Sequence, residues 1–277
     1  MNDPRRTART NTIAAAHLSA DLIGARTPVE GRPGQICVPV SDLLRSPSGP
    51  RDRQLLLGEQ VQIYETVSGQ HFVQAKKDGY VGYVPSDHVA EASKPTHWIT
   101  ARASHVYSKP DFKSPDRMAL SLGSHLRVLS EQGRFAETEQ GFVPLQHLAP
   151  VTQSESDPVS VAERLIGAPY LWGGNSAWGI DCSGLVQIAC LACNIPCPGD
   201  SDQQEAELGR ALPEGAQYQR GDVLFWKGHV AWVSAPDMLL HANVHHMAVA
   251  FEPLKDAITR IERQGDGPVT SHKRLDF

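Results

Sequence analysis

An internal repeat in the first half of the chain limits most strongly how this sequence can fold. The segment LGEQVQIYE from Leu57 returns as LGSHLRVLS from Leu122, and GYVPSDHVA from Gly82 returns as GFVPLQHLA from Gly141. Both segments recur in the same order, within short alternating strands broken by glycine, proline, serine and aspartate. We therefore predict two small β-barrels in tandem, over residues 34–92 and 93–150. One larger β domain with accidental internal similarity is the alternative.

The segments on either side of the repeat have a different character. Residues 1–33 are polar and end in glycine and proline, so we expect a short helix around TIAAAHLSADLIG followed by a linker. After a second linker, PVTQSESDP, a helix is predicted, because Asp157 is a typical N-cap residue and Pro158 is typical of the first helical position. A second helix, three strands, and a strand leading into a helix follow. This order predicts an α+β domain over residues 155–277.

Composition excludes some classes of function. The 277 residues are 40% hydrophobic, which is enough for globular cores, and a net charge of −5 argues against a nucleic-acid partner. The N-terminal stretch lacks the apolar run of a signal peptide, and no stretch approaches the ~18 apolar residues of a membrane span. The five cysteines are odd in number and four are clustered, which favours a reducing compartment. We expect a cytoplasmic protein.

The segment GIDCSGLVQIACLACN raises the question of what Cys182 does. It lies in the first turn of a predicted helix, directly after Asp181 and a glycine-rich loop. The unpaired N–H groups and the positive dipole end of a helix N-terminus stabilise a thiolate, which is the nucleophilic form of cysteine. A lone cysteine at a helix start is more often structural, so the nucleophile hypothesis needs partners elsewhere in the chain.

Two histidines are candidate partners. His229 begins a predicted strand directly after a tight glycine turn, and His241 lies on the next strand, twelve residues on. Two antiparallel strands with a short turn bring such residues side by side, so His241 can orient a basic His229. His245 and His246 are rivals for the orienting role, and we expect them at the surface.

The remaining cysteines of the helical segment suggest a metal or redox site at first sight. Cys190, Cys193 and Cys197 form a C-x2-C-x3-C pattern. A zinc or iron–sulfur site usually has a fourth ligand and loop geometry, whereas Cys190 and Cys193 lie within the predicted helix. We interpret them as small buried apolar residues and expect neither a metal nor a cofactor.

Three segments in order now point to a known family. YLWGGNSAWGIDCSGLV, RGDVLFWKGHVAWV and LLHAN together resemble the NlpC-type cysteine peptidases, which are papain-like, and DGYVGYVP resembles the last strands of bacterial SH3-like domains. The resemblance implies a papain-like α+β peptidase domain after two SH3-like barrels. It also implies that Cys182 is the nucleophile, His229 the base and His241 the third polar residue.

The whole chain further resembles the cytoplasmic γ-D-glutamyl-L-diamino acid endopeptidases of murein peptide recycling. That resemblance implies cleavage after D-glutamate in murein-derived peptides that have a free N-terminal L-alanine. It implies the following substrate-binding residues: Asp181 and Ser183 beside the nucleophile, Tyr80 and Asp52 in the first barrel, and Ser201 near the D-glutamyl carboxylate. The family often has arginine where Gly199 stands here, so the Ser201 contact lacks its usual partner.

Two other classes of function remain open at this point. One is a non-catalytic protein that binds murein peptides through its barrels, with a degenerate third domain. The other is a papain-like amidase or acyltransferase that acts on lipids or other amides. The intact set of Cys182, His229 and His241 favours catalysis over the first, and the tandem barrels favour peptides over the second.

Overall fold

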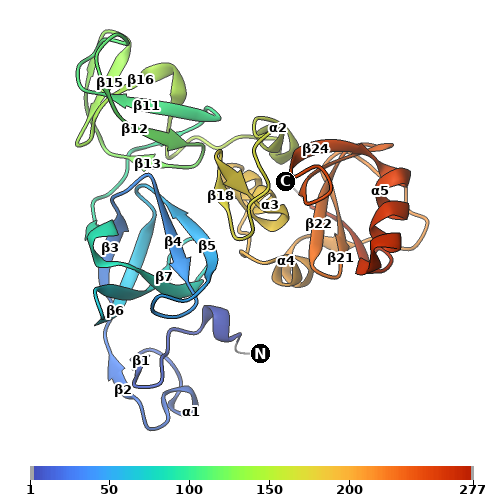
Figure 1. Cartoon of the computed structure of the whole chain (residues 1–277), viewed down its shortest axis with the longest axis horizontal. Helices are drawn as coiled ribbons and strands as arrows, with labels where there is room; N and C mark the ends of the chain where they lie inside the picture. The colour runs from blue at the N-terminus through green and yellow to red at the C-terminus, as the bar shows by residue number, and fades with distance from the viewer. Residues whose placement is uncertain (1–2, 276–277) are drawn as a thin grey trace. The chain divides into compact units, whose positions relative to one another are not determined.

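The computed structural model describes residues 3–275, which divide into two compact units that meet in sequence at Val151 and Thr152 (Figure 1). The N-terminal unit consists of β-strands with short helical turns, and the C-terminal unit combines helices with a β-sheet. Among residues 3–275, every helix is too short or too polar to cross a lipid bilayer.

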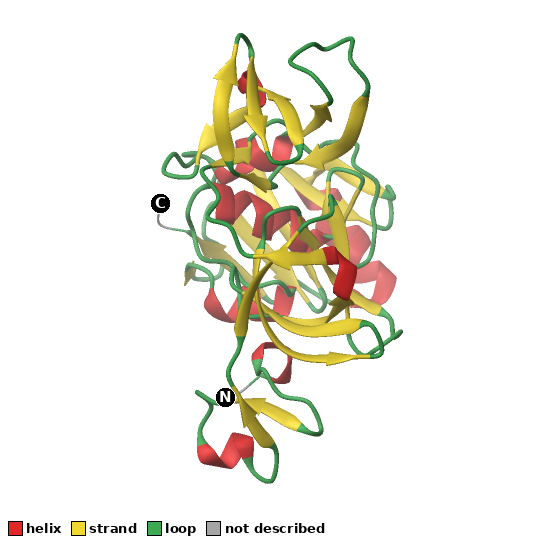
Figure 2. Cartoon of the chain, turned by 90° about the vertical axis from the view of Figure 1, so that its left-hand side faces the viewer, coloured by secondary structure: helices red, strands yellow, loops and turns green. Residues whose placement is uncertain are grey.

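The N-terminal segment is not the helix that the sequence predicts. Ile13–Ala15 forms strand β1, which pairs in parallel with β2 (Thr27–Val29), and only Ala20–Ile23 is helical (α1), as Figure 2 shows near the N-terminus. Ala14 and Ala15 are fully buried, and β1 packs against β6 (Gln60–Val67). Burial of this short apolar run in an extended form outweighs the helix preference of its alanines.

A seven-stranded antiparallel sheet follows, in the order β5-β4-β8-β7-β6-β3-β9. Besides β6, its strands are β3 (Arg32–Ile36), β4 (Val40–Leu44), β5 (Arg51–Leu56), β7 (Gln70–Ala75), β8 (Val81–Pro85) and β9 (Val89–Glu91). Alternate residues such as Leu43, Val61 and Val73 enclose an apolar core. Within the described residues β5 and β9 do not pair with each other, so the sheet is open rather than a closed barrel.

The second half of this unit repeats the strand order of the first. Its strands are β10 (His97–Ile99), β11 (Ala103–Tyr107), β12 (Asp116–Ser121), β13 (His125–Leu126), β14 (Val128–Gln132), β15 (Phe135–Thr138), β16 (Gly141–Pro144) and β17 (Leu148–Pro150). They form a five-stranded sheet, β12-β11-β16-β15-β14, and a three-stranded sheet, β13-β10-β17. The first of these orders corresponds strand by strand to β5-β4-β8-β7-β6. The internal repeat is therefore a repeat of topology, although a second SH3 barrel stays a prediction.

Matching residues hold the two copies in the same way. His88 bonds through Nδ1 to the hydroxyl of Ser41 at 2.9 Å, and His147 bonds likewise to Ser104 at 2.8 Å. Gly82 and Gly141 are also equivalent: an added Cβ would lie 2.7 Å from a side-chain carbon of Leu43 and 2.5 Å from the carbonyl oxygen of Tyr107, respectively. Only glycine allows the strands to approach this closely.

The C-terminal unit is built around a six-stranded antiparallel sheet in the order β20-β25-β21-β22-β23-β24. The strands are β20 (Arg210–Ala211), β21 (Asp222–Trp226), β22 (His229–Ala235), β23 (Met238–Asn243), β24 (Ala248–Pro253) and β25 (Ser271–Arg274). The helices are α2 (Pro158–Glu163), α3 (Cys182–Ala192), α4 (Ser201–Glu207) and α5 (Leu254–Ile261), and a small hairpin pairs β18 (Asn175–Ser176) with β19 (Gly179–Ile180). Figure 1 shows α2 and α3 on one side of this sheet and α5 on the other.

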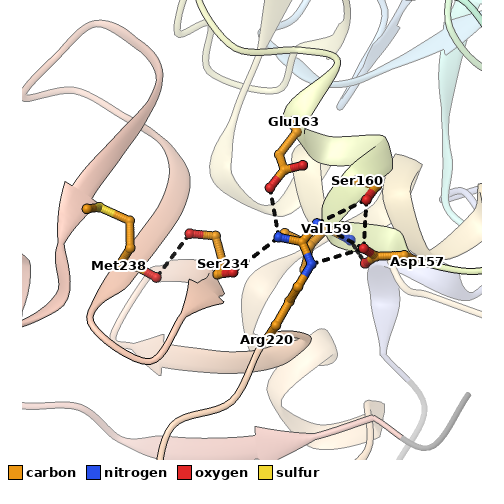
Figure 3. Close-up of polar contacts among 7 residues, drawn as sticks. All are labelled: Asp157, Val159, Ser160, Glu163, Arg220, Ser234 and Met238. Atoms are coloured by element: carbon orange, nitrogen blue, oxygen red, sulfur yellow. Dashed lines mark hydrogen bonds and ion pairs between the residues drawn. The ribbon is translucent and has the colours of Figure 1, made fainter.

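An arginine fastens α2 to the sheet (Figure 3). Arg220, just before β21, donates to Asp157 Oδ2 from Nε and Nη2 at 3.0 and 2.9 Å, and to Glu163 Oε1 from Nη1 at 2.8 Å. It also donates to the carbonyl of Ser234 in β22 at 3.1 Å. Asp157 caps α2 by accepting from the Val159 N–H, as the sequence predicts, but the helix ends at Glu163, before the expected Gly167.

Candidate active site

Cys182 is the first residue of helix α3 and is 7% exposed. The helix consists almost entirely of small and apolar residues and is buried from Cys182 to Cys190, so packing on all sides fixes the position of its N-terminus. The thiol therefore lies where the unpaired N–H groups of the first turn and the positive end of the helix dipole favour a negative charge.

Asp181 is the N-cap of α3, and both of its carboxylate oxygens accept hydrogen bonds from the chain. Oδ1 accepts from the Gly184 N–H at 2.6 Å and from the Ser183 hydroxyl at 3.1 Å, while Oδ2 accepts from the Gly173 N–H at 2.9 Å. An asparagine amide cannot accept at both positions, so it would not replace this aspartate as an equivalent cap. Asp181 and Ser183 thus lie beside Cys182 as predicted, and both help to shape the start of the helix.

His229 and His241 come together as the strand pattern predicts. His229 is the first residue of β22, and His241 lies on the antiparallel neighbour β23. Nε2 of His229 lies 2.9 Å from Nδ1 of His241. Helix α3 packs against both strands, which brings the helix that begins with Cys182 to the strands that carry the two imidazoles.

The hydrogen bonds continue beyond the predicted residues. Nε2 of His241 lies 3.0 Å from Oε2 of Glu252 in β24, and Glu252 accepts from Arg260 of α5 at both oxygens, each at 2.7 Å. His241 is fully buried and Glu252 is 6% exposed. We call His229, His241 and Glu252 the His–His–Glu chain. The sequence analysis missed Glu252 and Arg260, although a glutamate inside an apolar strand, AVAFEP, was an available signal.

The protonation states in this chain follow from burial and charge. Burial, together with smaller contributions from His241 and Arg260, lowers the pKa of His229 to about 3, although Glu252 opposes the change. Burial also lowers the pKa of His241, although Glu252 opposes the change. Burial disfavours the carboxylate of Glu252, but the hydrogen bonds from Arg260 and His241 outweigh it and hold the pKa of Glu252 below its usual range. At neutral pH both imidazoles are therefore neutral and Glu252 is charged.

Tyr170 is a second residue that the sequence analysis missed. Burial raises the pKa of its phenol, and charges on Cys182 and Asp181 raise it further, so the phenol stays protonated near the thiol. The backbone holds Tyr170 in place, because its N–H donates to the Met247 carbonyl at 2.9 Å. YLWGG in the sequence was a signal for a loop at this place, but nothing in it singled out the tyrosine.

The other predicted binding residues occupy three places. Ser201 begins α4, which is joined to α3 because Gln204 Nε2 donates to the Ser183 carbonyl at 2.8 Å. Tyr80 packs in the apolar core of the seven-stranded sheet. Asp52 lies on β5, where Arg45 Nη2 donates to its carboxylate at 2.7 Å. Tyr80 and Asp52 belong to the N-terminal unit, and the other predicted binding residues belong to the C-terminal one.

The rival residues take other roles. The rings of His245 and His246 stack edge to face on the exposed turn between β23 and β24, outside the His–His–Glu chain.

Cys190 and Cys197 are buried, as predicted, and a hydrogen bond with Cys197 together with burial raises the pKa of the Cys190 thiol. Cys193 is only half-buried.

Comparison with known proteins identifies two domains. Residues 167–262 match the NlpC/P60 family, and residues 43–89 match the bacterial dipeptidyl-peptidase Sh3 domain. Dipeptidyl-peptidase 6 of Lysinibacillus sphaericus is 28% identical over 216 residues, which cover 69% of this chain and 79% of that protein. A gamma-D-glutamyl-L-lysine dipeptidyl-peptidase of Bacillus subtilis is 30% identical over 194 residues, which cover 62% of this chain and 63% of that protein.

A protein of the same name from Bacillus cereus is 25% identical over 239 residues, 73% of this chain and 70% of its own length. Among solved structures, an NlpC/P60 family protein from Bacillus cereus superposes with a TM-score of 0.73 and 18% identity, over 88% of this chain and 99% of that one. This likeness shows a common fold. The C-terminal part of the chain is thus an NlpC/P60 domain, and it follows a bacterial SH3 domain.

Proposed function

We propose that the chain is a cysteine peptidase whose nucleophile is Cys182 and whose general base is His229. The observation that carries this proposal is the hydrogen bond between His229 and His241, on strands that pack against the helix that Cys182 begins. A neutral, half-buried imidazole accepts a proton from a thiol that a helix N-terminus helps to ionise. The arrangement is that of a nucleophile, a base and a group that orients the base.

The proposed reaction has two halves. The thiol of Cys182 passes its proton to His229, and the thiolate attacks the carbonyl carbon of the scissile amide. The C–N bond breaks, His229 returns the proton to the leaving amine, and a thioester remains on Cys182. Water then attacks the thioester while His229 removes its proton, which releases the acid and restores the thiol. The N–H of Cys182 at the helix start stabilises the oxyanion in both halves.

The proposed substrate is a murein-derived peptide with a free N-terminal L-alanine, cut between D-glutamate and the following diamino acid. Support comes from the Bacillus relatives, whose names specify γ-D-glutamyl-L-lysine and a dipeptidyl-peptidase activity. An enzyme that releases a dipeptide must recognise the amine end of its substrate. The SH3 domain named for dipeptidyl-peptidases supports a part for the N-terminal unit in that recognition.

The proposed location is the cytoplasm, where the enzyme meets peptides already released from the wall.

Asp181 and Ser183 are the proposed partners of the substrate ammonium on the peptidase side, because they adjoin the nucleophile. Tyr80 and Asp52 are the residues proposed for the same role in the N-terminal unit. Since Asp181 also caps α3, its substitution is expected to affect both stability and substrate binding.

Mass spectrometry of the products tests the bond and the amine requirement together. The substrates are L-Ala-γ-D-Glu-L-Lys and its N-acetylated form, with a meso-diaminopimelate analogue of each. We expect release of L-Ala-γ-D-Glu and at least a hundredfold preference for the free amine in kcat/KM, about 2.7 kcal/mol of transition-state discrimination. Efficient cleavage of acetylated peptides or intact murein would contradict the proposed specificity, while leaving the peptidase assignment in place.

A further inference from the structure

Glu252 sits at the end of the His–His–Glu chain and determines the direction of its hydrogen bonds. A carboxylate has no proton to donate, so Nε2 of His241 must be the N–H donor across the 3.0 Å contact. A neutral imidazole carries only one N–H, so Nδ1 of His241 is an acceptor. Nε2 of His229 must then be the donor across the 2.9 Å contact. Nδ1 of His229 is left with its lone pair.

Which nitrogen of His229 is basic thus depends on Glu252, which lies two hydrogen bonds away. If Glu252 were an amide, it could either accept from His241 or donate to it, and both imidazoles could reverse their N–H groups. His229 would then present its lone pair to His241 rather than to a reactant. The charge of Glu252 also stabilises the imidazolium that forms on His229 when it takes a proton.

Arg260 forms a bidentate ion pair with Glu252. Its Nε and Nη2 donate to the two oxygens of Glu252 at 2.7 Å each, and its Nη1 donates to Gln264 at 2.6 Å. Arg260 comes from α5, so this ion pair joins α5 to β24. Its positive charge acts on the two imidazoles in the opposite sense to the charge of Glu252.

We propose that Glu252 is a positioning residue: it fixes the direction of both imidazole N–H groups and leaves Nδ1 of His229 as the base that takes the proton of Cys182. This inference rests on the proposed function. The alternative is that Glu252 and Arg260 only fasten α5 to β24, as Arg220 fastens α2 to the sheet.

The charged and titratable groups around the chain support opposite effects for the two members of the ion pair. Glu252 raises the pKa of His229, whereas Arg260 and His241 lower it. The same holds at His241, where Glu252 raises the pKa and Arg260 and His246 lower it. Loss of Glu252 therefore makes His229 a weaker base, and loss of Arg260 makes it a stronger one. A purely structural ion pair predicts the same loss from both substitutions.

The test is the rate at which iodoacetamide alkylates Cys182, followed by peptide mass spectrometry at pH 6 and pH 10. Glu252→Gln should slow alkylation at pH 6 at least about tenfold, one pKa unit, and leave the rate at pH 10 unchanged, because a thiol ionises there without a base. Arg260→Gln should label at pH 6 at least as fast as the wild type. Arg220→Gln, which breaks a comparable ion pair elsewhere, is the matched control and should match the wild type at both pH values.

Three results would overturn this role of Glu252: wild-type labelling of Glu252→Gln at pH 6, an equal loss at both pH values, or a parallel loss in Arg260→Gln at pH 6. The wild-type protein separates this inference from the function on which it rests. If wild-type Cys182 labels rapidly at pH 6, these results remove only the role of Glu252. If wild-type Cys182 reacts no faster than an ordinary thiol, the proposed function fails and the inference fails with it.

Discussion

Histidines that bond to a β-strand occur in both units of this protein, and their hydrogen-bond partners differ in an instructive way. In the N-terminal unit, His88 and His147 are each hydrogen-bonded to one serine hydroxyl, in the same position of the repeat. In the C-terminal unit, His229 is bonded to a second histidine, which is bonded in turn to a buried carboxylate. A hydroxyl can rotate to suit either tautomer, whereas a carboxylate imposes one.

By this difference, His88 and His147 support the fold, whereas His229 has the surroundings that a proton-transfer role requires. A single bond to a hydroxyl satisfies a ring nitrogen and links a helical turn to a strand. A chain that ends in a fixed charge also specifies which nitrogen carries the proton. Burial lowers the pKa of both His147 and His229, so burial does not distinguish the two histidines. The residue at the far end of the hydrogen-bond chain, Glu252 in the case of His229, does distinguish them.

The largest expected effect comes from removing the proposed nucleophile of the C-terminal site. Cys182→Ala should reduce peptide hydrolysis to below detection, because no other thiol lies at the start of α3 to replace the nucleophile. The fold should be kept, because alanine fits at the first position of a helix. The check is turnover of the tripeptide substrate together with circular dichroism. Hydrolysis at a tenth of the wild-type rate in the folded variant would be incompatible with this nucleophile.

The next effect compares the two imidazoles of the C-terminal site. His229→Ala should lower kcat/KM at least tenfold more than His241→Ala does, a difference of about 1.4 kcal/mol in barrier height. The reason is that loss of the base itself costs more than loss of the residue that orients it. His245→Ala and His246→Ala serve as controls and should stay near the wild-type rate. Equal losses at His229 and His241, or a larger loss at His245 or His246, would show that the roles are assigned wrongly.

The smallest effect concerns the paired histidines of the N-terminal unit. Ser104→Ala removes the hydroxyl that bonds to His147, and Ser41→Ala removes its counterpart at His88. Each change should cost about 1 kcal/mol of unfolding free energy, since it takes away one partly buried hydrogen bond. Denaturant unfolding measures that cost, and the alkylation rate of Cys182 should not change. A slower Cys182 in either variant would mean that these histidines do more than support the fold.

Sequence reasoning reached the members of the site that short motifs mark. Cys182 follows a loop and begins a helix, and His229 and His241 lie on neighbouring strands, so local patterns placed all three. Glu252 and Arg260 escaped because their roles depend on the strand register between β23 and β24 and on the docking of α5, which no local pattern specifies. Both residues are far from Cys182 in sequence, so the sequence did not indicate that they bond to the predicted histidines.

The fold shows the same division between local and long-range information. The repeat in the sequence corresponds to a repeated strand order, and the three strands and the helix that begins at Cys182 lie where their patterns predict, whereas α2 ends at Glu163 instead of Gly167. The helix expected around TIAAAHLSADLIG is wrong over Ile13–Ala15, which forms a strand. That outcome depends on packing against β6, and propensity alone cannot reveal it.

The measurement that tests the central claim most directly compares three cysteines of the same molecule. Burial raises the pKa of the half-buried Cys37, and it raises the pKa of the half-buried Cys193 to about 11. In wild-type protein treated with iodoacetamide at pH 6, Cys182 should be alkylated at least tenfold faster than either, because Cys182 begins a helix and is the proposed partner of the neutral imidazole of His229. Peptide mass spectrometry gives the three rates from one sample. A Cys182 that reacts no faster than Cys37 and Cys193 would contradict an activated nucleophile, and with it the proposed cysteine peptidase.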